Sequence, residues 1–141
     1  KFFILEPGYI GFEETIYLVK ESVGKAEIKV LRINGADGRV TVRYRTKDID
    51  AIATRDYERR IFSLKNKTNK DIFSISKTVD QELVFEHGEI SKVIAIPIVN
   101  DLEAEKDESF AVELYKPTDG AQLGKHTKTV VTIINDDGTE N

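Results

Sequence analysis

The sequence predicts an all-β protein, built as an antiparallel β-sandwich of about seven short strands. Three observations favour this fold class. Apolar and polar residues alternate with a period of two through most apolar segments, which is the pattern of half-buried strands. Turn-forming residues, such as NGADG at 34–38, separate these segments. No stretch of ten or more residues has the 3.6-residue period of a helix, so a sandwich fits the pattern best.

Each expected strand rests on its own alternation. In the segment 25–33, Ala26, Ile28 and Val30 belong to one face and the charged residues between them to the other. Pro97 lies inside an alternating segment, so its strand is expected at a sheet edge or a bulge. In chain order the expected strands are 15–21, 25–33, 39–46, 82–89, 92–99, 109–115 and 127–135.

A single domain is expected over residues 1–141, with a basic loop insertion at about 58–80. The length and the 40% of hydrophobic residues suffice for one core. The insertion carries six basic residues against three acids, and insertions of this kind are tolerated at exposed loops. Its centre, KNKTNK at 65–70, is expected to be a loop, and 71–79 either a strand or a short helix.

Composition excludes several kinds of function. The chain has no cysteine, so disulfides and thiolate metal sites are impossible. Its formal net charge of −4 gives no general attraction to nucleic acid. No run of about 18 apolar residues is present to insert into a membrane, and KFFILEP at the start is too short for a signal peptide. A soluble part of a larger membrane protein would have the same properties.

Carboxylates gather where strands are expected to end. Five lie between Val99 and Phe110, and others follow expected strands at Glu21, at Asp56 and at 136–137. Calcium takes six to eight oxygen ligands, and the twelve-residue loop of an EF-hand is missing. A calcium site would therefore have to be assembled from several segments. The alternative is that the five-acid loop is a solvated connection and that the single acids are ordinary surface residues.

Four segments together resemble a Calx-beta domain, the module of the cytosolic regulatory loop of sodium/calcium exchangers. They are VKESVGKAEIKVLRINGADGRVTVRYRT, TRDYE, ELVFEHGEISKVIAIPIVNDLEAEKDESFAVEL and TVVTIINDD, in the family's order. The first is most similar to the second of the two tandem exchanger domains. The resemblance implies an immunoglobulin-like sandwich that binds Ca2+ at one tip. Carried over by motif, the metal ligands are Glu21, Asp56, Asp101, Glu105, Glu108, Asp136 and Asp137.

Two further ligand positions of the family carry amides in this chain. Asn100 and Asn135 stand where calcium-binding members have Asp, and each such change removes a negative charge and weakens a calcium site. Glu103 and Asp107 are expected to be solvated. An alternative to calcium is that a cation of the insertion, such as Arg59 or Arg60, folds over the acids and partly replaces the metal.

The resemblance implies a regulatory domain with no enzymatic activity, in the cytoplasmic part of a plasma-membrane calcium:sodium antiporter. Its partners would be a neighbouring Calx-beta domain and the transmembrane exchanger segments that carry out ion transport. A calcium-silent coupling domain and an extracellular adhesion or matrix domain are the alternatives, and the sequon at 66–68 would suit the latter. His87 and His126 are expected at the surface, without the context of a catalytic triad.

Overall fold

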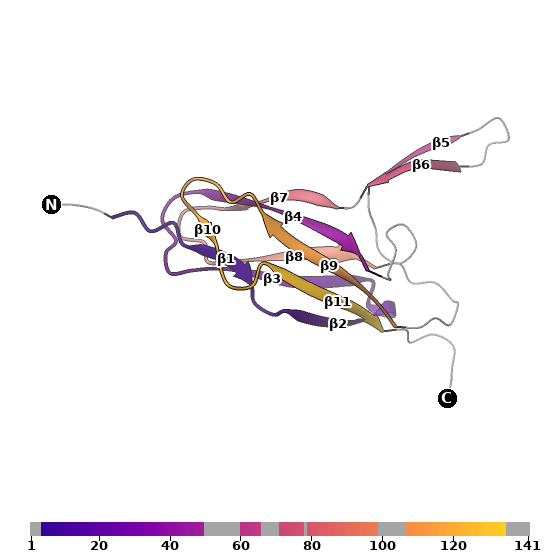
Figure 1. The fold of residues 1–141 in the computed structure, drawn as a ribbon, viewed down its shortest axis with the longest axis horizontal. Helices are drawn as coiled ribbons and strands as arrows, with labels where there is room; N and C mark the ends of the chain where they lie inside the picture. Colours follow the sequence, from indigo (N-terminus) through magenta and orange to yellow (C-terminus); the bar gives the residue numbers. More distant parts are fainter. Residues whose placement is uncertain (1–3, 50–59, 66–70, 78, 99–106, 135–141) are drawn as a thin grey trace.

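The chain forms a sandwich of two β-sheets, with a β-hairpin that makes a third, separate sheet (Figure 1). The computed structural model describes residues 4–49, 60–65, 71–77, 79–98 and 107–134, and at 60–65 and 71–77 it describes the backbone only. The elements are β1 (Tyr9–Phe12), β2 (Ile16–Lys20), the 3-10 helix η1 (Glu21–Val23), β3 (Lys25–Ile33), β4 (Val40–Asp48), β5 (Arg60–Lys65), β6 (Asp71–Lys77), β7 (Asp80–Phe85), β8 (Ser91–Pro97), β9 (Glu108–Tyr115), β10 (Gln122–Leu123) and β11 (Lys128–Ile134). This part of the chain has no helix with the length and hydropathy needed to cross a membrane.

The predicted all-β sandwich is confirmed. One sheet has four strands in the order β10-β1-β3-β8, and the other has five in the order β2-β11-β9-β4-β7. Neighbouring strands are antiparallel except at two places, where β1 pairs with β10 and β2 pairs with β11 in parallel. Both exceptions join the first strands of the chain to the last ones.

The two sheets contain nine strands rather than about seven, because two short strands were not predicted. The first expected strand, 15–21, corresponds to β2 alone, whereas β1 precedes it and pairs in the other sheet. β10 has only two residues, too few to show an alternation. In the insertion, β5 and β6 pair as a hairpin, so residues 71–77 form a strand and not a helix.

The core lies between the two sheets and includes the inward positions predicted by the alternation, together with Ile10 and Phe12 of the unpredicted β1. Ala26, Ile28 and Val30 of β3 are fully buried, and they face residues such as Phe110 of β9 in one continuous cluster. Burying one such large apolar side chain contributes roughly 1.5–3 kcal/mol. β8 lies at an edge of its sheet with Pro97 as its last residue, which confirms the prediction made from that proline.

Candidate metal centre

Several strands end or begin at one end of the sandwich, next to segments that carry the predicted ligands. In the five-stranded sheet, the end of β11 lies beside the end of β2 through the pair Ile134 and Lys20. The start of β9 lies beside β11 through Glu108 and Ile133. Figure 1 shows the start of β9 and the end of β11 at this same end, to which η1 is joined directly after β2. We call it the Glu21 end.

The four-stranded sheet and β4 contribute to the Glu21 end as well. Lys25 at the start of β3 pairs with Pro97 at the end of β8, and the amide of Ile98 donates a hydrogen bond of 2.9 Å to the Gly24 carbonyl oxygen. β4 also ends here, since Asp48 is the register partner of Phe110. The strands β2, β4, β8 and β11 therefore all end at the Glu21 end, where β9 begins.

Glu21 is the most informative of the predicted ligands, because it is buried. Its residue is 2% exposed, and it begins η1, which closes with Gly24 in the left-handed conformation at φ 86°. Among the described residues no other carboxylate side chain is buried to this degree. The interpretation of Glu21 as an ordinary surface acid is therefore wrong. A buried carboxylate needs hydrogen bonds or a cation to offset the loss of hydration, and carboxylate oxygen is the ligand that calcium prefers.

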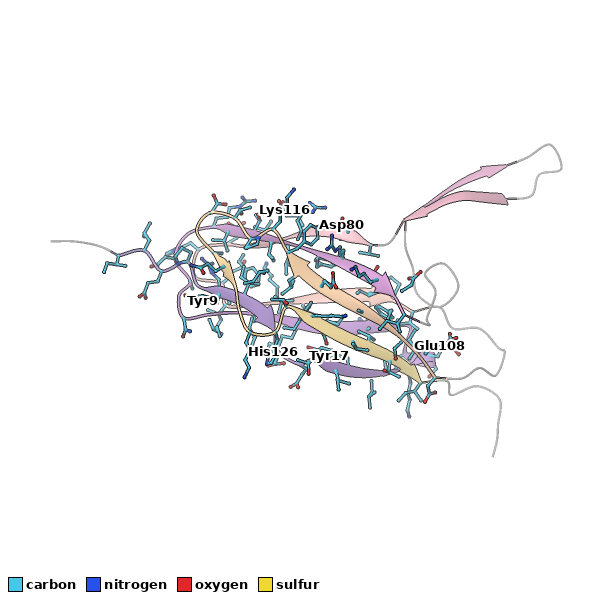
Figure 2. All side chains as sticks on the ribbon, in the orientation of Figure 1. Tyr9, Tyr17, Asp80, Glu108, Lys116 and His126 are labelled. Carbon is cyan, nitrogen blue, oxygen red and sulfur yellow. The ribbon has the colours of Figure 1, made fainter. Side chains whose placement is uncertain are left out.

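Glu108 is the second predicted ligand that the structure describes. It is the first residue of β9, at the Glu21 end, and is half-buried (Figure 2). Its neighbour Asp107 is exposed, in agreement with its expected solvation. Glu21 and Glu108 thus belong to the same end of the molecule and are brought there by strands that are distant in sequence.

The other predicted ligands lie outside the described residues, as do the two amides and Glu103. They are Asp56, Asp101, Glu105, Asp136 and Asp137, with Asn100 and Asn135. Arg59 and the side chain of Arg60 are outside as well, so the replacement of calcium by a cation of the insertion stays a prediction. Within the described ranges no three acidic or histidine side chains are grouped closely enough to hold a metal ion.

One buried charged residue was not predicted from the sequence. Arg32 of β3 is 2% exposed and lies at the opposite end of the sandwich. Burial lowers its pKa, an effect opposed by the nearby carboxylates of Asp37 and Glu89. The signal was present in the alternation, since Arg32 continues the inward series 26, 28 and 30. Of the histidines, His87 is exposed and His126 is half-buried.

Comparison with known proteins identifies the family. The Calx-beta domain model matches residues 5–137. The chain is 34% identical over 110 residues to the sodium/calcium exchanger Calx of Drosophila melanogaster, which covers 78% of this chain and 10% of the exchanger. It is also 31% identical over 132 residues to the adhesion G-protein coupled receptor V1 of Danio rerio, covering 93% of this chain and 2% of the receptor. The chain thus spans a tenth or less of the length of these relatives.

Two solved domains share the fold along most of their length. The apo-form Calx CBD1 domain superposes with a TM-score of 0.74 at 26% identity, over 92% of this chain and 97% of that domain. The Calx CBD2 domain gives 0.72 at 28% identity, over 92% and 87%. These values do not assign the chain to one of the two, although its sequence suggested the second. The family is a non-catalytic one, as expected from the absence of a catalytic motif. From the family match and the shared fold, the chain belongs to the Calx-beta domains.

Proposed function

We propose that this domain is a cytosolic regulatory domain of a sodium/calcium exchanger and that its Glu21 end responds to calcium. The observation that carries the proposal is the buried carboxylate of Glu21, at an end where β4, β8, β9 and β11 adjoin segments rich in acids. Acidic loops repel one another without metal, so calcium would order them. The altered rigidity of this end would then reach a neighbouring domain.

The proposed ligand set is the one that the family motif gives. Glu21 and Glu108 would be ligands from the described strands, and Asp56, Asp101, Glu105, Asp136 and Asp137 from the adjoining segments. Asn100 and Asn135 lower the negative charge of the site, so we propose weak binding, of one ion or two. The domain most resembles the second tandem domain in its 21–38 segment, and similarity to both Calx CBD1 and Calx CBD2 supports a neighbouring domain of the same kind as its partner.

Calcium titration of the isolated domain tests this proposal. A ligand that binds only the native state adds RT ln(1 + [L]/Kd) to stability, so millimolar calcium should raise the melting temperature and give heat in calorimetry, whereas magnesium should do neither. Glu21→Gln should abolish the calcium-dependent shift, and Asp107→Asn, at an exposed acid, should preserve it. No heat and no thermal shift up to millimolar calcium would leave a calcium-silent coupling domain as the function.

The weakening assigned to the two amides has its own test. Asn100→Asp combined with Asn135→Asp should lower the calcium Kd by about tenfold or more, because two negative charges return to the site. Equal affinity of the wild type and the double variant would show that these amides are not the cause of weak binding.

A second candidate function is an extracellular adhesion domain, which the match to the adhesion receptor along 93% of this chain favours. The sequon at Asn66 would accept glycan only in the secretory pathway. Mass spectrometry of the natural protein distinguishes the two, since glycan on Asn66 requires the extracellular location and excludes the cytosolic one.

A further inference from the structure

Arg32 joins three segments of the chain at the end opposite Glu21. Its side chain is buried, and all of its described hydrogen bonds go to backbone carbonyl oxygens. The distances are 2.7 Å from Nε to Pro7, 3.1 Å from Nη1 to Glu86, 2.7 Å from Nη2 to Asp37 and 2.8 Å from Nη2 to Gly38. The planar guanidinium can make these bonds together because its donors point in fixed directions. We call Arg32 with these four residues the Arg32 cluster.

Further hydrogen bonds connect the same segments around the Arg32 cluster. The amide of Asp37 donates to the Glu6 carbonyl oxygen at 3.1 Å, and the Glu6 amide donates to Asp37 Oδ2 at 2.9 Å. The Gly38 amide donates to His87 Nδ1 at 2.9 Å. The Gly88 amide donates to the Ala36 carbonyl oxygen at 2.8 Å. The two turns 34–39 and 86–90 are thus bonded to each other as well as to Arg32.

These two turns are crossovers between the sheets. Residues 34–39 connect β3 of the four-stranded sheet to β4 of the five-stranded sheet, and residues 86–90 connect β7 of the five-stranded sheet back to β8. The sheets of a sandwich touch through side chains and not through backbone hydrogen bonds. Arg32 therefore adds four polar contacts at the end where both crossovers link the two sheets, beyond the apolar packing and the few other hydrogen bonds between them.

The strands held by the Arg32 cluster lead to the Glu21 end. β3 begins beside Gly24 at that end and reaches Arg32 after a span of roughly 23 Å at the usual rise per residue. β4 and β8 start at the two crossovers and finish beside the segments 50–59 and 99–106, which carry Asp56, Asp101 and Glu105. Where each of these strands reaches at the Glu21 end thus depends on where the same strand is held near Arg32.

We propose that Arg32 is a positioning residue for the Glu21 end. By joining the two crossovers, Arg32 fixes one sheet against the other, and this also fixes the ends of β4 and β8, which adjoin the segments with the candidate ligands. Calcium ligands must meet at about 2.3–2.6 Å from the ion, so a small slip between the sheets changes the site. The expected effect of Arg32 on calcium affinity rests on the proposed function. Its expected effect on the order of the calcium-free Glu21 end does not.

Amide hydrogen exchange in the calcium-free domain tests the inference. Arg32→Lys keeps the charge and loses the fork of donors. Arg39→Lys is the matched control, because Arg39 is exposed in the same crossover and lysine keeps the positive charge of its exposed ion pair with Glu86, which is 3.6 Å long. Relative to the core amide of Val112, protection of the Ile98 amide should fall about tenfold in Arg32→Lys and stay unchanged in the control. A loss confined to amides of the end that contains Arg32 (the Arg32 end), such as Asp37 and Gly88, would overturn the proposal.

A milder variant keeps the test decisive if Arg32→Lys does not fold. His87→Ala removes only the bond from the Gly38 amide, at an exposed side chain, and should lower the relative protection of Ile98 about threefold. Unchanged protection of Ile98 in this variant would count against the proposal in the same way.

Calcium titration of the same variants separates this inference from the proposed function. If the wild type binds calcium, Kd should rise about tenfold in Arg32→Lys and not in Arg39→Lys, and equal affinities would overturn the positioning role. If the wild type binds no calcium, the proposed function fails, and exchange at Ile98 still decides the role of Arg32.

Discussion

Two buried threonines of the five-stranded sheet differ in whether their hydroxyl groups are hydrogen-bonded. Thr46 of β4 is buried, and its Oγ1 accepts a hydrogen bond of 3.1 Å from the Val79 amide. Thr129 of β11 is 0% exposed, and its Oγ1 has no hydrogen-bond partner among the described residues. A buried hydroxyl without a partner costs about 1–3 kcal/mol, so the same residue type has opposite effects at the two positions.

Thr129→Val should therefore raise the free energy of unfolding by about 1 kcal/mol, since valine has the same shape and no unpaired polar atom. Thr46→Val is the control and should lower it by about 1 kcal/mol, because the Val79 amide loses its acceptor. Urea unfolding measures both. Destabilisation by Thr129→Val would show that the hydroxyl has a partner in solution.

Glycines at the crossover 34–39 give a second contrast at the residue scale. A Cβ at Gly35, where φ is 140°, would lie 2.1 Å from the Glu6 carbonyl oxygen, whereas a Cβ at Gly38, where φ is 79°, would meet nothing within 4 Å. Gly38→Ala should cost about 1 kcal/mol from backbone strain alone. Gly35→Ala should cost at least about 2 kcal/mol more in urea unfolding, because backbone must move. Equal costs would contradict this close approach.

At the scale of elements, β2 is an edge strand with an apolar outer face. Ile16 and Leu18 are 65% and 67% exposed, and β2 lies at the margin of the five-stranded sheet. Exposed apolar edge strands invite pairing with other chains. Leu18→Lys should reduce self-association in sedimentation and change stability by less than about 0.5 kcal/mol. Thr15→Lys adds the same charge beside the strand, so an equal reduction there would indicate a general effect of charge.

The turn between β7 and β8 contains a carboxylate that favours its charged form. The Glu86 amide donates to Glu89 Oε1 at 2.7 Å, and Lys92 Nζ lies 3.1 Å from the same oxygen. These contacts lower the pKa of Glu89. A lowered folded-state pKa stabilises the protein above the unfolded-state pKa, and this stabilisation is lost as pH falls through the folded-state pKa.

Glu89→Gln should accordingly be less stable than the wild type at pH 7, with a difference that shrinks below about pH 4. Thermal unfolding from pH 7 to pH 3 measures it. In a Lys92→Met background the difference at pH 7 should be smaller, since one of the two contacts is gone. A difference that stays constant over this pH range would rule out titration of Glu89 as the cause.

The sequence predicted the elements in which alternation is long and uninterrupted. β3 has the predicted bounds, because charged and apolar residues alternate from Lys25 to Val30 and buried positions continue to alternate up to Ile33. β1 was missed because a four-residue strand containing Gly11 shows too little pattern, and β10 because it has two residues. The burial of Glu21, at the end of a strand, depends on contacts between distant segments, which no local pattern encodes. The burial of Arg32 also needs carbonyl partners from distant segments. The inward position of Arg32 was nevertheless visible in the series 26, 28, 30 and 32.

At the scale of the whole molecule, the two ends of the sandwich are built from different chemistry. The Arg32 end is closed by a buried cation bonded to carbonyl oxygens, and the Glu21 end contains a buried acid beside acid-rich segments. If, as proposed, calcium binds at the Glu21 end, the state of the domain changes at that end only, because the opposite end already holds the guanidinium of Arg32. Calcium should therefore slow amide exchange at Gly24 and Ile98 and leave Asp37 and Gly88 unchanged.

The parallel pairing of β2 with β11 has a mechanical consequence. Five register pairs, from Ile16 with Val130 to Lys20 with Ile134, join the beginning of the sandwich to its last strand. The described chain starts at the Arg32 end, since Pro7 contacts Arg32, and finishes at the Glu21 end with Ile134. Tension applied between these two points would pull β2 and β11 in opposite directions along their common axis. The hydrogen bonds between β2 and β11 would then bear the force together, in shear, and would not open one after another as in unzipping.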